Sequence, residues 1–388
     1  MRFCQLTLVL LYAVSMYQLA VELALHRRPR VLELFDTMPT AASLKTFERN
    51  LQTVSLSRQT IGAATRRALA DWLGFAGSDL VLGVDGWLFH GPGVRYVTGP
   101  GILDASRQSA HIEDEPDFVP DPRPAIFRFN RDCKQAGAVL VLLPIPDKSM
   151  VQPRQLGVTS EISARPYWAN NTGFDRLVAE LRAGGVEVYF PSLSPAGDGK
   201  IYFLRQDSHW TPEAMDTAAR DVAAMLVAKK FLEPGRPGAG FRMEPRTLTA
   251  AGDLPGLGSL TAGCKLYREQ TIVVQRVLDR VTGKPWAPDE KADVLLLADS
   301  FTGVFSDQIY WGDAAGFAEH LSWHLGRGLA TIVGNGFGAW KARAEVVKQP
   351  ELLKGKRLVL WEFAVRELIA ESWPVLPIPN RPPSGSGR

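Results

Sequence analysis

From about residue 120 to residue 375, short apolar runs alternate with segments of helical periodicity. The run "AVLVLLPIP" is bounded by prolines and shows no polar alternation, which is typical of a strand buried on both faces. Such alternation predicts a doubly wound α/β domain, in which helices cover both faces of a parallel sheet. The expected strands are 138–146, 186–190, 292–300, 329–334 and 356–363, and the expected helices are 125–137, 172–185, 211–231, 313–327 and 339–347.

The N-terminus carries an apolar stretch of a different kind. Residues 3–21 contain no charged side chain, and a stretch of about 19 residues is just long enough to cross a bilayer. No convincing A-x-A cleavage site follows, so we expect residues 1–27 to be an uncleaved signal anchor. A cleaved signal peptide and a buried core helix are the alternatives. The basic "HRRPR" that follows argues by itself for that side staying inside, so charge does not predict export.

The remaining organisation follows from composition. We expect a helical linker at 28–79, one α/β domain at 80–375 and a loose tail at 376–388. A Gly/Pro-rich section at 233–290, with strands such as "QTIVVQRVL", reads as an insertion in that domain. The net charge is only +3 and no dense Lys/Arg stripe occurs, which argues against nucleic acid as a partner. The three cysteines form no CxxC pair, which excludes a zinc ribbon and a thioredoxin-like motif.

A candidate nucleophile stands at the end of a predicted strand. Ser300 closes the run "ADVLLLADS", and functional groups of open parallel sheets gather at the carboxyl ends of their strands. The position resembles that of the nucleophile in α/β hydrolases, although no GxSxG motif is present. The alternative is structural, because Asp and Ser at a strand-to-helix junction are common helix N-caps.

A candidate base and its partner lie in "RQDSHWTPEA" (205–214). Thr211 has the features of an N-cap with Pro212 at the first helical position, so Asp207 and His209 precede a helix directly. Residues two apart in an extended segment share a face, which allows the carboxylate to bond Nδ1–H and leaves Nε2 for a serine proton. The positive end of the following helix is expected to favour neutral imidazole. The alternative is a solvated turn with an Asx-type bond.

A second pair of histidines has metal-ligand spacing. His320 and His324 stand at i and i+4, which places both on one face of a helix. The glutamate of HExxH is absent, and no carboxylate or cysteine partner is evident in the sequence. Packed or surface histidines are therefore the favoured interpretation, and we expect no metal and no cofactor.

Several blocks together resemble one family. "DSHWTPEA" resembles the "D-[TS]-H-W-T-P-x-G" signature of the alginate O-acetyltransferases of the AlgJ/AlgX type, which are SGNH-hydrolase-like proteins. "ADSFT" resembles their "GDSF[TS]" nucleophile block, and "DGWLF" (85–89), "PIPDKSMVQP" (144–153) and "LVLWEFAVREL" (358–368) follow in the expected order. The resemblance covers roughly residues 80–370. Ala298, Gln152 and Ala214 depart from a usual glycine, tyrosine and glycine, which leaves the triad intact and puts substrate preference in doubt.

The resemblance implies roles for particular residues. Ser300 matches the nucleophile, His209 the general base and Asp207 the carboxylate that orients it. Arg366 matches a position near the substrate groove. The backbone N–H of Ser300 and, as a second donor, Asn335 are our oxyanion candidates.

Further candidates lie next to these blocks. Trp210, Tyr310 and Trp311 are candidate stacking platforms for a sugar, with core packing as the alternative. Lys148 and Arg366 are candidates for attracting an anionic polysaccharide, with ordinary ion pairing as the alternative.

The resemblance also implies an activity and a location. It implies an O-acetyltransferase that moves an acetyl group through an acetyl-serine to hydroxyls of an exported polysaccharide. It implies the periplasmic side of the inner membrane and a membrane-embedded acyltransferase as acetyl supplier. A polysaccharide acetylesterase with the same triad and a non-catalytic carbohydrate-binding assembly protein are the alternatives.

Overall fold

The computed structural model describes residues 16–36, 38, 40, 43–44, 47, 62–73, 75–107, 117–157, 170–191, 193, 200–258, 260, 262–308, 310–334, 336 and 338–378. The chain divides into two compact units. The first contains Met1–Ala76 and Gly258–Leu266, and the second contains Gly77–Leu257 and Tyr267–Arg388. The candidate site residues that the structure describes all lie in the second unit.

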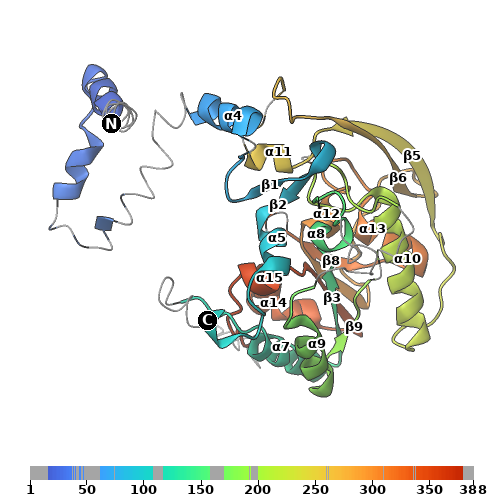
Figure 1. The fold of residues 1–388 in the computed structure, drawn as a ribbon. Helices are drawn as coiled ribbons and strands as arrows, with labels where there is room; N and C mark the ends of the chain where they lie inside the picture. The colour runs from blue at the N-terminus through green and yellow to red at the C-terminus, as the bar shows by residue number, and fades with distance from the viewer. Residues whose placement is uncertain are drawn as a thin grey trace, which may run out of the picture. The chain divides into compact units, whose positions relative to one another are not determined.

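A five-stranded sheet forms the centre of the second unit (Figure 1). Its strand order is β4-β3-β9-β7-β8 and every neighbouring pair is parallel. This confirms the predicted α/β fold with a parallel central sheet. The strands are β3 (Val139–Ile145), β4 (Glu187–Val188), β7 (Val294–Ala298), β8 (Ala330–Val333) and β9 (Leu358–Ala364).

Burial explains why the sequence pattern of these strands is continuous rather than alternating. Every side chain of β7 and β9 is buried, and only the first residue of β3 is exposed. Both faces are covered, so the positions of the central strands are apolar, apart from the buried Glu362 of β9. The edge strand β4 is shorter than expected, although the amide of Tyr189 still donates to the carbonyl of Leu142 beyond its end.

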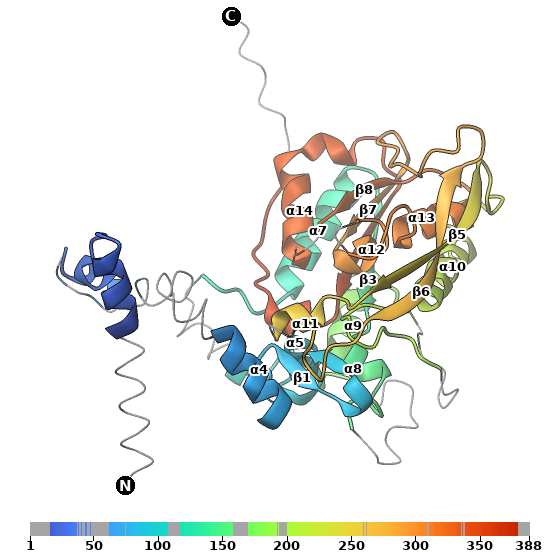
Figure 2. The ribbon, with the colours of Figure 1, turned by 90° about the horizontal axis from the view of Figure 1, so that it is seen from above.

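Helices lie on both sides of the sheet. Seen from above, α7 (Arg123–Gln135) and α14 (Ala339–Lys348) lie on one side (Figure 2). On the other side are α12 (Ser300–Gly303), α13 (Phe317–Leu325) and α10 (Pro212–Ala228). Further helices are α5 (Gly91–Thr98), α8 (Lys148–Val151), α9 (Phe174–Ala183), α11 (Leu254–Leu257) and α15 (Glu367–Ala370), with 3₁₀ turns η2 (Val84–Gly86) and η4 (Pro350–Leu353).

The predicted insertion contains a long antiparallel pair of strands. β5 (Phe241–Ala250) pairs with β6 (Gln270–Asp279) along the full length of both strands. The predicted strand "QTIVVQRVL" is confirmed as β6, which contacts α10 and α13. The chain between β5 and β6 contributes α11 and the Gly252–Asp253 turn, which reaches the candidate site.

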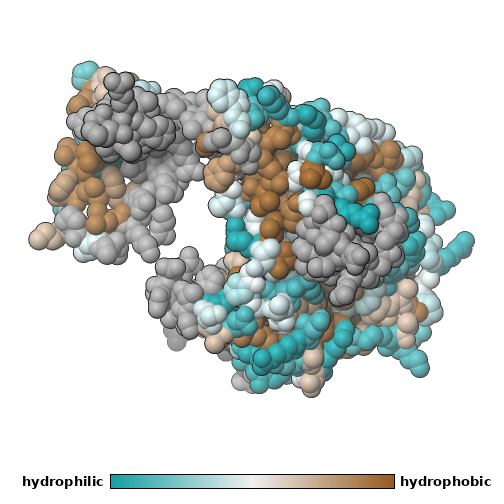
Figure 3. Space-filling model, in the orientation of Figure 1, coloured by the Kyte–Doolittle hydropathy of each residue, from teal (hydrophilic) through white to brown (hydrophobic). Residues whose placement is uncertain are grey.

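A smaller antiparallel pair, β1 (Leu80–Leu82) and β2 (Leu88–His90), lies outside the central sheet. In Figure 3, apolar residues gather where Figure 1 places β1, β2 and α11. Exposed apolar side chains of this part of the chain include Val84, which follows β1, and Leu257 at the end of α11.

The first unit contains η1 (Arg30–Phe35) and α4 (Gly62–Leu73). Within it, the amide of Lys265 donates to Asp71 of α4 at 3.1 Å. Most of the predicted anchor at 1–27 lies outside the described residues. None of the helices within the described ranges is both long enough and apolar enough to cross a membrane. The anchor and the boundaries drawn at residues 27, 79 and 375 stay predictions.

Candidate active site

The loop that carries Asp207 and His209 is closed by backbone bonds across its base. Phe203 and Trp210 form an antiparallel bridge, and the amide of Leu204 donates to the carbonyl of His209 at 3.1 Å. α10 begins immediately afterwards. The side chain of Thr211 accepts from the amide of Ala214 at 3.2 Å, so the predicted N-cap is confirmed. The loop is thus tight and starts a long helix, unlike a solvated turn.

Asp207 is completely buried, and both of its carboxylate oxygens are bonded. Oδ1 lies 2.6 Å from His209 Nδ1 and also accepts the His209 amide at 2.9 Å. Oδ2 accepts from the indole N–H of Trp311 at 2.7 Å and from the amide of Asp253 at 3.2 Å. Although burial acts to raise it, the charge and hydrogen bond of His209 lower the pKa of Asp207 to about 2. The carboxylate therefore stays ionised at neutral pH.

Ser300 lies within hydrogen-bonding distance of the histidine. His209 Nε2 is 2.9 Å from Ser300 Oγ. Ser300 is the first residue of α12, at the carboxyl end of β7, where the sequence predicted it. The capping role belongs to its neighbour, because Asp299 accepts from the amide of Phe301 at 2.7 Å. The N-cap alternative for Ser300 itself is therefore wrong, and its hydroxyl faces the imidazole.

A buried acidic pair lies beneath the nucleophile turn. The amide of Asp299 and the hydroxyl of Thr302 both donate to Glu362 Oε2, at 3.2 and 2.9 Å. Asp299 Oδ2 accepts from the amide of Ala364 at 2.9 Å, which joins α12 to β9. Burial, followed by the charge of Asp299, raises the pKa of Glu362 well above its ordinary value. Sequence inspection did not single out Glu362.

Two of the proposed stacking aromatics are core residues. Trp210 has no exposed surface, stacks on Phe317, and donates from its indole N–H to the carbonyl of Phe301 at 3.0 Å. Trp311 is buried and its indole N–H is bonded to Asp207. Neither ring offers a face to a sugar, so the stacking hypothesis is wrong for both. The core-packing alternative holds instead.

Lys148 is also misassigned as a residue that attracts a polymer. It is 1% exposed, and its ammonium donates to the carbonyls of Leu88 and Leu204, both at 2.6 Å. It donates as well to the carbonyls of Arg205 at 2.9 Å and Asp207 at 3.0 Å. Burial lowers the pKa of Lys148 to about 7. The buried amino group, with four carbonyls around it, stabilises the Asp207–His209 loop and has no surface for an anionic chain.

The remaining candidates have mixed outcomes. Arg366 follows β9 at the carboxyl edge, and its guanidinium is buried and paired with Asp147 at 3.1 Å, so the ion-pair alternative describes it. Tyr310 is partly exposed, with its ring centre 6.3 Å from that of His209, and its contact with a sugar stays a prediction. Asn335 lies outside the described residues, so its oxyanion role also stays a prediction.

Asp253 is a further acidic residue that sequence inspection missed. It accepts from the amide and hydroxyl of Ser208, at 2.7 and 2.6 Å, and its Oδ2 lies 3.8 Å from His209 Nδ1. The preceding Gly252 has φ +88°, and a Cβ there would lie 2.6 Å from the carbonyl of Gln206 and 2.7 Å from Asp207 Cβ. The motif "AGD" is too short to reveal this role from sequence.

The electrostatic surroundings of His209 reverse one expectation. Burial lowers the pKa of His209, but the charge and hydrogen bond of Asp207 and the charge of Asp253 outweigh it. The pKa therefore lies above its ordinary value of 6.5. The expectation that the start of α10 would favour the neutral form is wrong, because these carboxylates dominate over a helix terminus.

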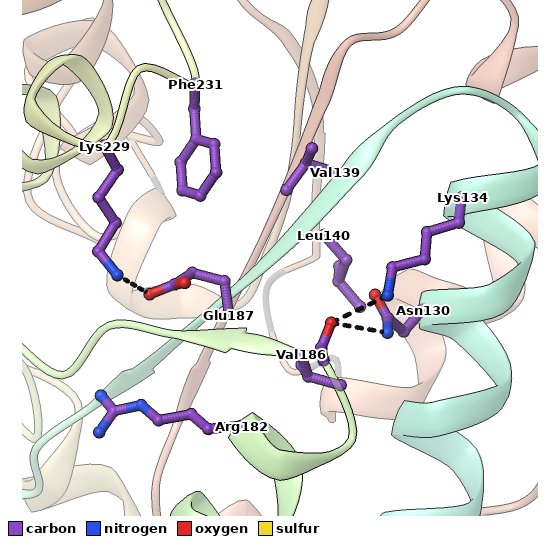
Figure 4. Close-up of a pocket in the computed structure, with 10 residues that line it drawn as sticks. Asn130, Lys134, Val139, Leu140, Arg182, Val186, Glu187, Lys229 and Phe231 are labelled. Carbon is purple, nitrogen blue, oxygen red and sulfur yellow. Dashed lines mark hydrogen bonds and ion pairs between the residues drawn. The ribbon is translucent and has the colours of Figure 1, made fainter.

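A cavity of about 430 Å³ lies at the opposite end of the sheet (Figure 4). Val139 and Leu140 line it at the start of β3, with Glu187 of β4. Its basic side chains already have partners: Lys229 pairs with Glu187, and Lys134 donates to the carbonyl of Gly185. It is therefore separate from the triad and belongs to a different edge of the fold.

A parallel sheet with an Asp-His-Ser arrangement at the carboxyl edge defines the class of α/β hydrolases and acyltransferases that work through an activated serine. A family model described as SGNH hydrolase-like domain, acetyltransferase AlgX, matches residues 80–365. The chain belongs to this family.

Individual relatives agree. The probable alginate O-acetylase AlgJ of Pseudomonas putida is 27% identical over 302 residues, which are 74% of this chain and 70% of the relative. The AlgJ of Pseudomonas aeruginosa is 26% identical over 156 residues, 40% of this chain. The chain thus spans only 34% of that relative's length. The solved O-acetyltransferase domain of Pseudomonas putida AlgJ has a TM-score of 0.55 and covers 76% of this chain and 93% of that one. Its sequence identity is 22%, so this likeness shows the fold.

Replacing Lys148 by methionine is expected to lower the free energy of unfolding by about 3 kcal/mol. The substitution leaves buried carbonyls without donors, and each such group costs about 1–3 kcal/mol. Urea denaturation measures the change. Lys134→Met is the matched control, because Lys134 is exposed and makes a single carbonyl bond; its effect is expected to stay within about 0.5 kcal/mol. A fully stable Lys148→Met protein would contradict the structural role.

The pKa of His209 is expected to lie above 6.5 in the wild type and to fall in Asp253→Asn, because a carboxylate beside Nδ1 favours the charged ring. NMR titration of the His209 ring measures both values without relying on activity. Asp307→Asn controls for general charge removal, since the charge of Asp307 does not enter the shift of His209. An unchanged or higher pKa in Asp253→Asn would overturn this account.

Proposed function

We propose that the protein is an O-acetyltransferase that moves an acetyl group to hydroxyls of an exported polysaccharide through an acetyl-serine at Ser300. The observation that carries this proposal is the continuous line of contacts from Asp207 through His209 to Ser300, at 2.6 and 2.9 Å. These distances are those of hydrogen bonds between a base, its orienting carboxylate and a nucleophile. Membership of an acetyltransferase family supports acetyl as the group that is transferred.

The first half of the reaction loads the serine. Ser300 Oγ attacks the carbonyl carbon of an acetyl donor while His209 Nε2 takes the hydroxyl proton. The bond from the carbonyl carbon to the donor oxygen then breaks, and that oxygen leaves with the proton from Nε2. The product is an ester between Ser300 and the acetyl group.

The second half repeats these steps with a sugar hydroxyl as nucleophile. His209 Nε2 takes the sugar proton, the sugar oxygen bonds to the acetyl carbon, and Ser300 Oγ leaves with the proton. Asp207 holds Nδ1–H, so the lone pair of neutral imidazole stays on Nε2, and it stabilises the imidazolium of each step. Because the pKa of His209 is raised, the neutral base and hence the rate increase as pH rises through that pKa.

The tetrahedral intermediates carry negative charge on the former carbonyl oxygen. The amide of Ser300 is a candidate donor, since it belongs to the first turn of α12, where amides lack partners within the helix. Asn335, in the segment after β8, is the second candidate. Tyr310 is the aromatic candidate for contact with the acceptor sugar.

The proposal extends to the setting of the reaction. The AlgJ relatives are named for alginate, so an anionic exopolysaccharide is the substrate class that we propose. The uncharged residues 3–21 support attachment to a membrane. The family resemblance supports the inner membrane, with the domain on its periplasmic side. We also propose a membrane-embedded acyltransferase as acetyl supplier, because nothing in the proposed reaction brings acetyl groups across a membrane.

The first test follows the fate of an acetyl group. Wild-type protein is treated with a chromogenic acetyl ester, and mass spectrometry searches for an acetyl adduct on Ser300. Ser300→Ala is expected to abolish the adduct and to lower kcat/KM at least about 1000-fold. Ser306→Ala is the matched control, because its hydroxyl contacts Glu319 rather than the triad.

Each outcome has a distinct meaning. An adduct that is discharged to added glycan supports transfer, whereas discharge to water alone replaces the proposal with an acetylesterase. If wild type and Ser300→Ala both lack adduct and turnover, the protein is a carbohydrate-binding member of the family.

Trp311→Phe is expected to lower kcat/KM for a small acetyl ester about 10-fold. The change removes a buried hydrogen bond to ionised Asp207, and such a bond contributes about 1.5–3 kcal/mol. The control Trp286→Phe removes an indole bond to Ser322 and should leave the rate nearly unchanged. An unchanged rate in Trp311→Phe would contradict this role of the indole hydrogen bond.

A further inference from the structure

Two histidines and an aspartate converge between α10 and α13, which pack against each other and contact β6 (Figure 1). His320 Nδ1 and His324 Nε2 each lie 2.7 Å from Asp216 Oδ1. The sequence revealed the i, i+4 histidine pair without a carboxylate partner. Folding supplies that partner from 104 residues earlier in the chain, on the second turn of α10.

The hydrogen bond on the far side of His320 determines which nitrogen carries its proton. His320 Nε2 lies 2.8 Å from the carbonyl oxygen of Gln275 in β6, and a carbonyl only accepts. Nε2 is therefore protonated, which leaves the lone pair of the neutral ring on Nδ1. That lone pair faces a carboxylate oxygen, which is also an acceptor. A cation has to lie between these two atoms, and it is either a proton or a metal ion.

This arrangement matches the surroundings of a metal-binding histidine. A ligating imidazole generally donates its other ring N–H to a backbone carbonyl or a carboxylate, which orients the ring. His320 is 2% exposed and is held in this way by Gln275. Its ligating nitrogen is thus aimed at Asp216 before any ion binds.

We propose that Asp216, His320 and His324 form a binding site for a divalent transition metal, with zinc as the expected occupant. Two imidazole nitrogens and one carboxylate oxygen are a donor set that zinc accepts, with water as a fourth ligand. The three ligand atoms lie within 4.8 Å of one another. The side chain of Asp216 is 34% exposed and that of His324 is 11% exposed, which leaves an open side for the ion and its water.

The fit requires a small opening of the cluster. Tetrahedral zinc, with bonds of about 2.0–2.1 Å, separates its ligand atoms by about 3.3 Å. The present N–O separations of 2.7 Å therefore need to widen by about 0.6 Å. Asp216 has room for this movement because its carboxylate lies at the surface, whereas the position of His320 is set by Gln275.

A bound ion would link two helices next to the triad. α10 begins three residues after His209, and α13 begins with Phe317, on which Trp210 stacks. The proposed metal site therefore has a structural position. It joins α10, which follows the proposed base His209, to α13, which packs on Trp210.

The test is a metal-binding measurement on the untagged full-length protein after removal of metals with a chelator. Equilibrium dialysis against zinc chloride, read by inductively coupled plasma mass spectrometry, is expected to give one zinc per chain. The melting temperature is expected to rise by about 5 °C when free zinc exceeds the Kd about 100-fold. Neither readout depends on acetyltransferase activity.

Variants identify the ligands. Asp216→Asn and His324→Gln are expected to weaken zinc binding at least about 100-fold, since even loss of an outer partner costs about 10–100-fold. Asp221→Asn is the matched control on the same helix, because Asp221 is partly exposed and its ion pair is with Arg220 rather than with a histidine. His209→Ala is the second control, since Asp207, His209 and Asp253 are the other cluster of metal-ligand type among the described residues. Both controls are expected to keep the zinc.

Circular dichroism shows whether each variant folds. Because the side chain of Asp216 is partly exposed, Asp216→Asn is the ligand variant expected to disturb the core least. Loss of zinc from folded Asp216→Asn, with zinc kept in both controls, supports the site. Absence of stoichiometric zinc from the wild type shows that the cation is a proton in an ion pair and overturns the proposal. Loss of zinc from His209→Ala alone places the ion at the triad and equally overturns it.

Discussion

The arrangement of this protein depends most on the burial of one charge, the carboxylate of Asp207. A buried carboxylate is tolerated only when its oxygens are bonded, because desolvation costs several kcal/mol. Here the donors come from three segments: His209 beside it, Asp253 after β5, and Trp311 after α12. Satisfying this one group therefore aligns the histidine loop, the inserted hairpin and the segment that follows the nucleophile.

The same loop is held from two further sides. Lys148 binds the carbonyls of Leu204, Arg205 and Asp207, and its ammonium lies 4.9 and 5.0 Å from the ring centres of Trp87 and Phe89. Trp210 donates to the carbonyl of Phe301, directly after Ser300. The blocks that carry the family resemblance thus meet at one place: two supply the Asp-His loop and the serine, and the others supply the groups that hold them.

The pKa values of the acidic groups around the triad differ because their hydrogen-bond partners and neighbouring charges differ. Burial disfavours the charge of both groups, but the contacts of Asp207 lower its pKa to about 2, whereas the charge of Asp299 adds to burial and raises the pKa of Glu362. The histidine is more basic than usual because Asp253 adds to the field of Asp207. Acyl transfer on this scaffold is therefore expected to favour neutral to alkaline conditions, where the imidazole is uncharged.

The sequence was enough to predict the central strands and the cap at Thr211, and it proposed Ser300, His209 and Asp207, which the structure brings within hydrogen-bonding distance of one another. These features could be predicted because their signals are local in the sequence. A strand covered on both faces requires a continuous apolar run, and a helix cap or an Asp-x-His pair involves residues only a few positions apart. Only the tertiary structure decided what each neighbouring polar or aromatic side chain does. Lys148, Trp210 and Trp311 read as substrate contacts in the chain, yet each is buried with its polar atoms bonded to backbone or to Asp207. Asp253 and Asp216 reach their histidines from distant segments, and no local pattern encodes a contact that long-range packing creates.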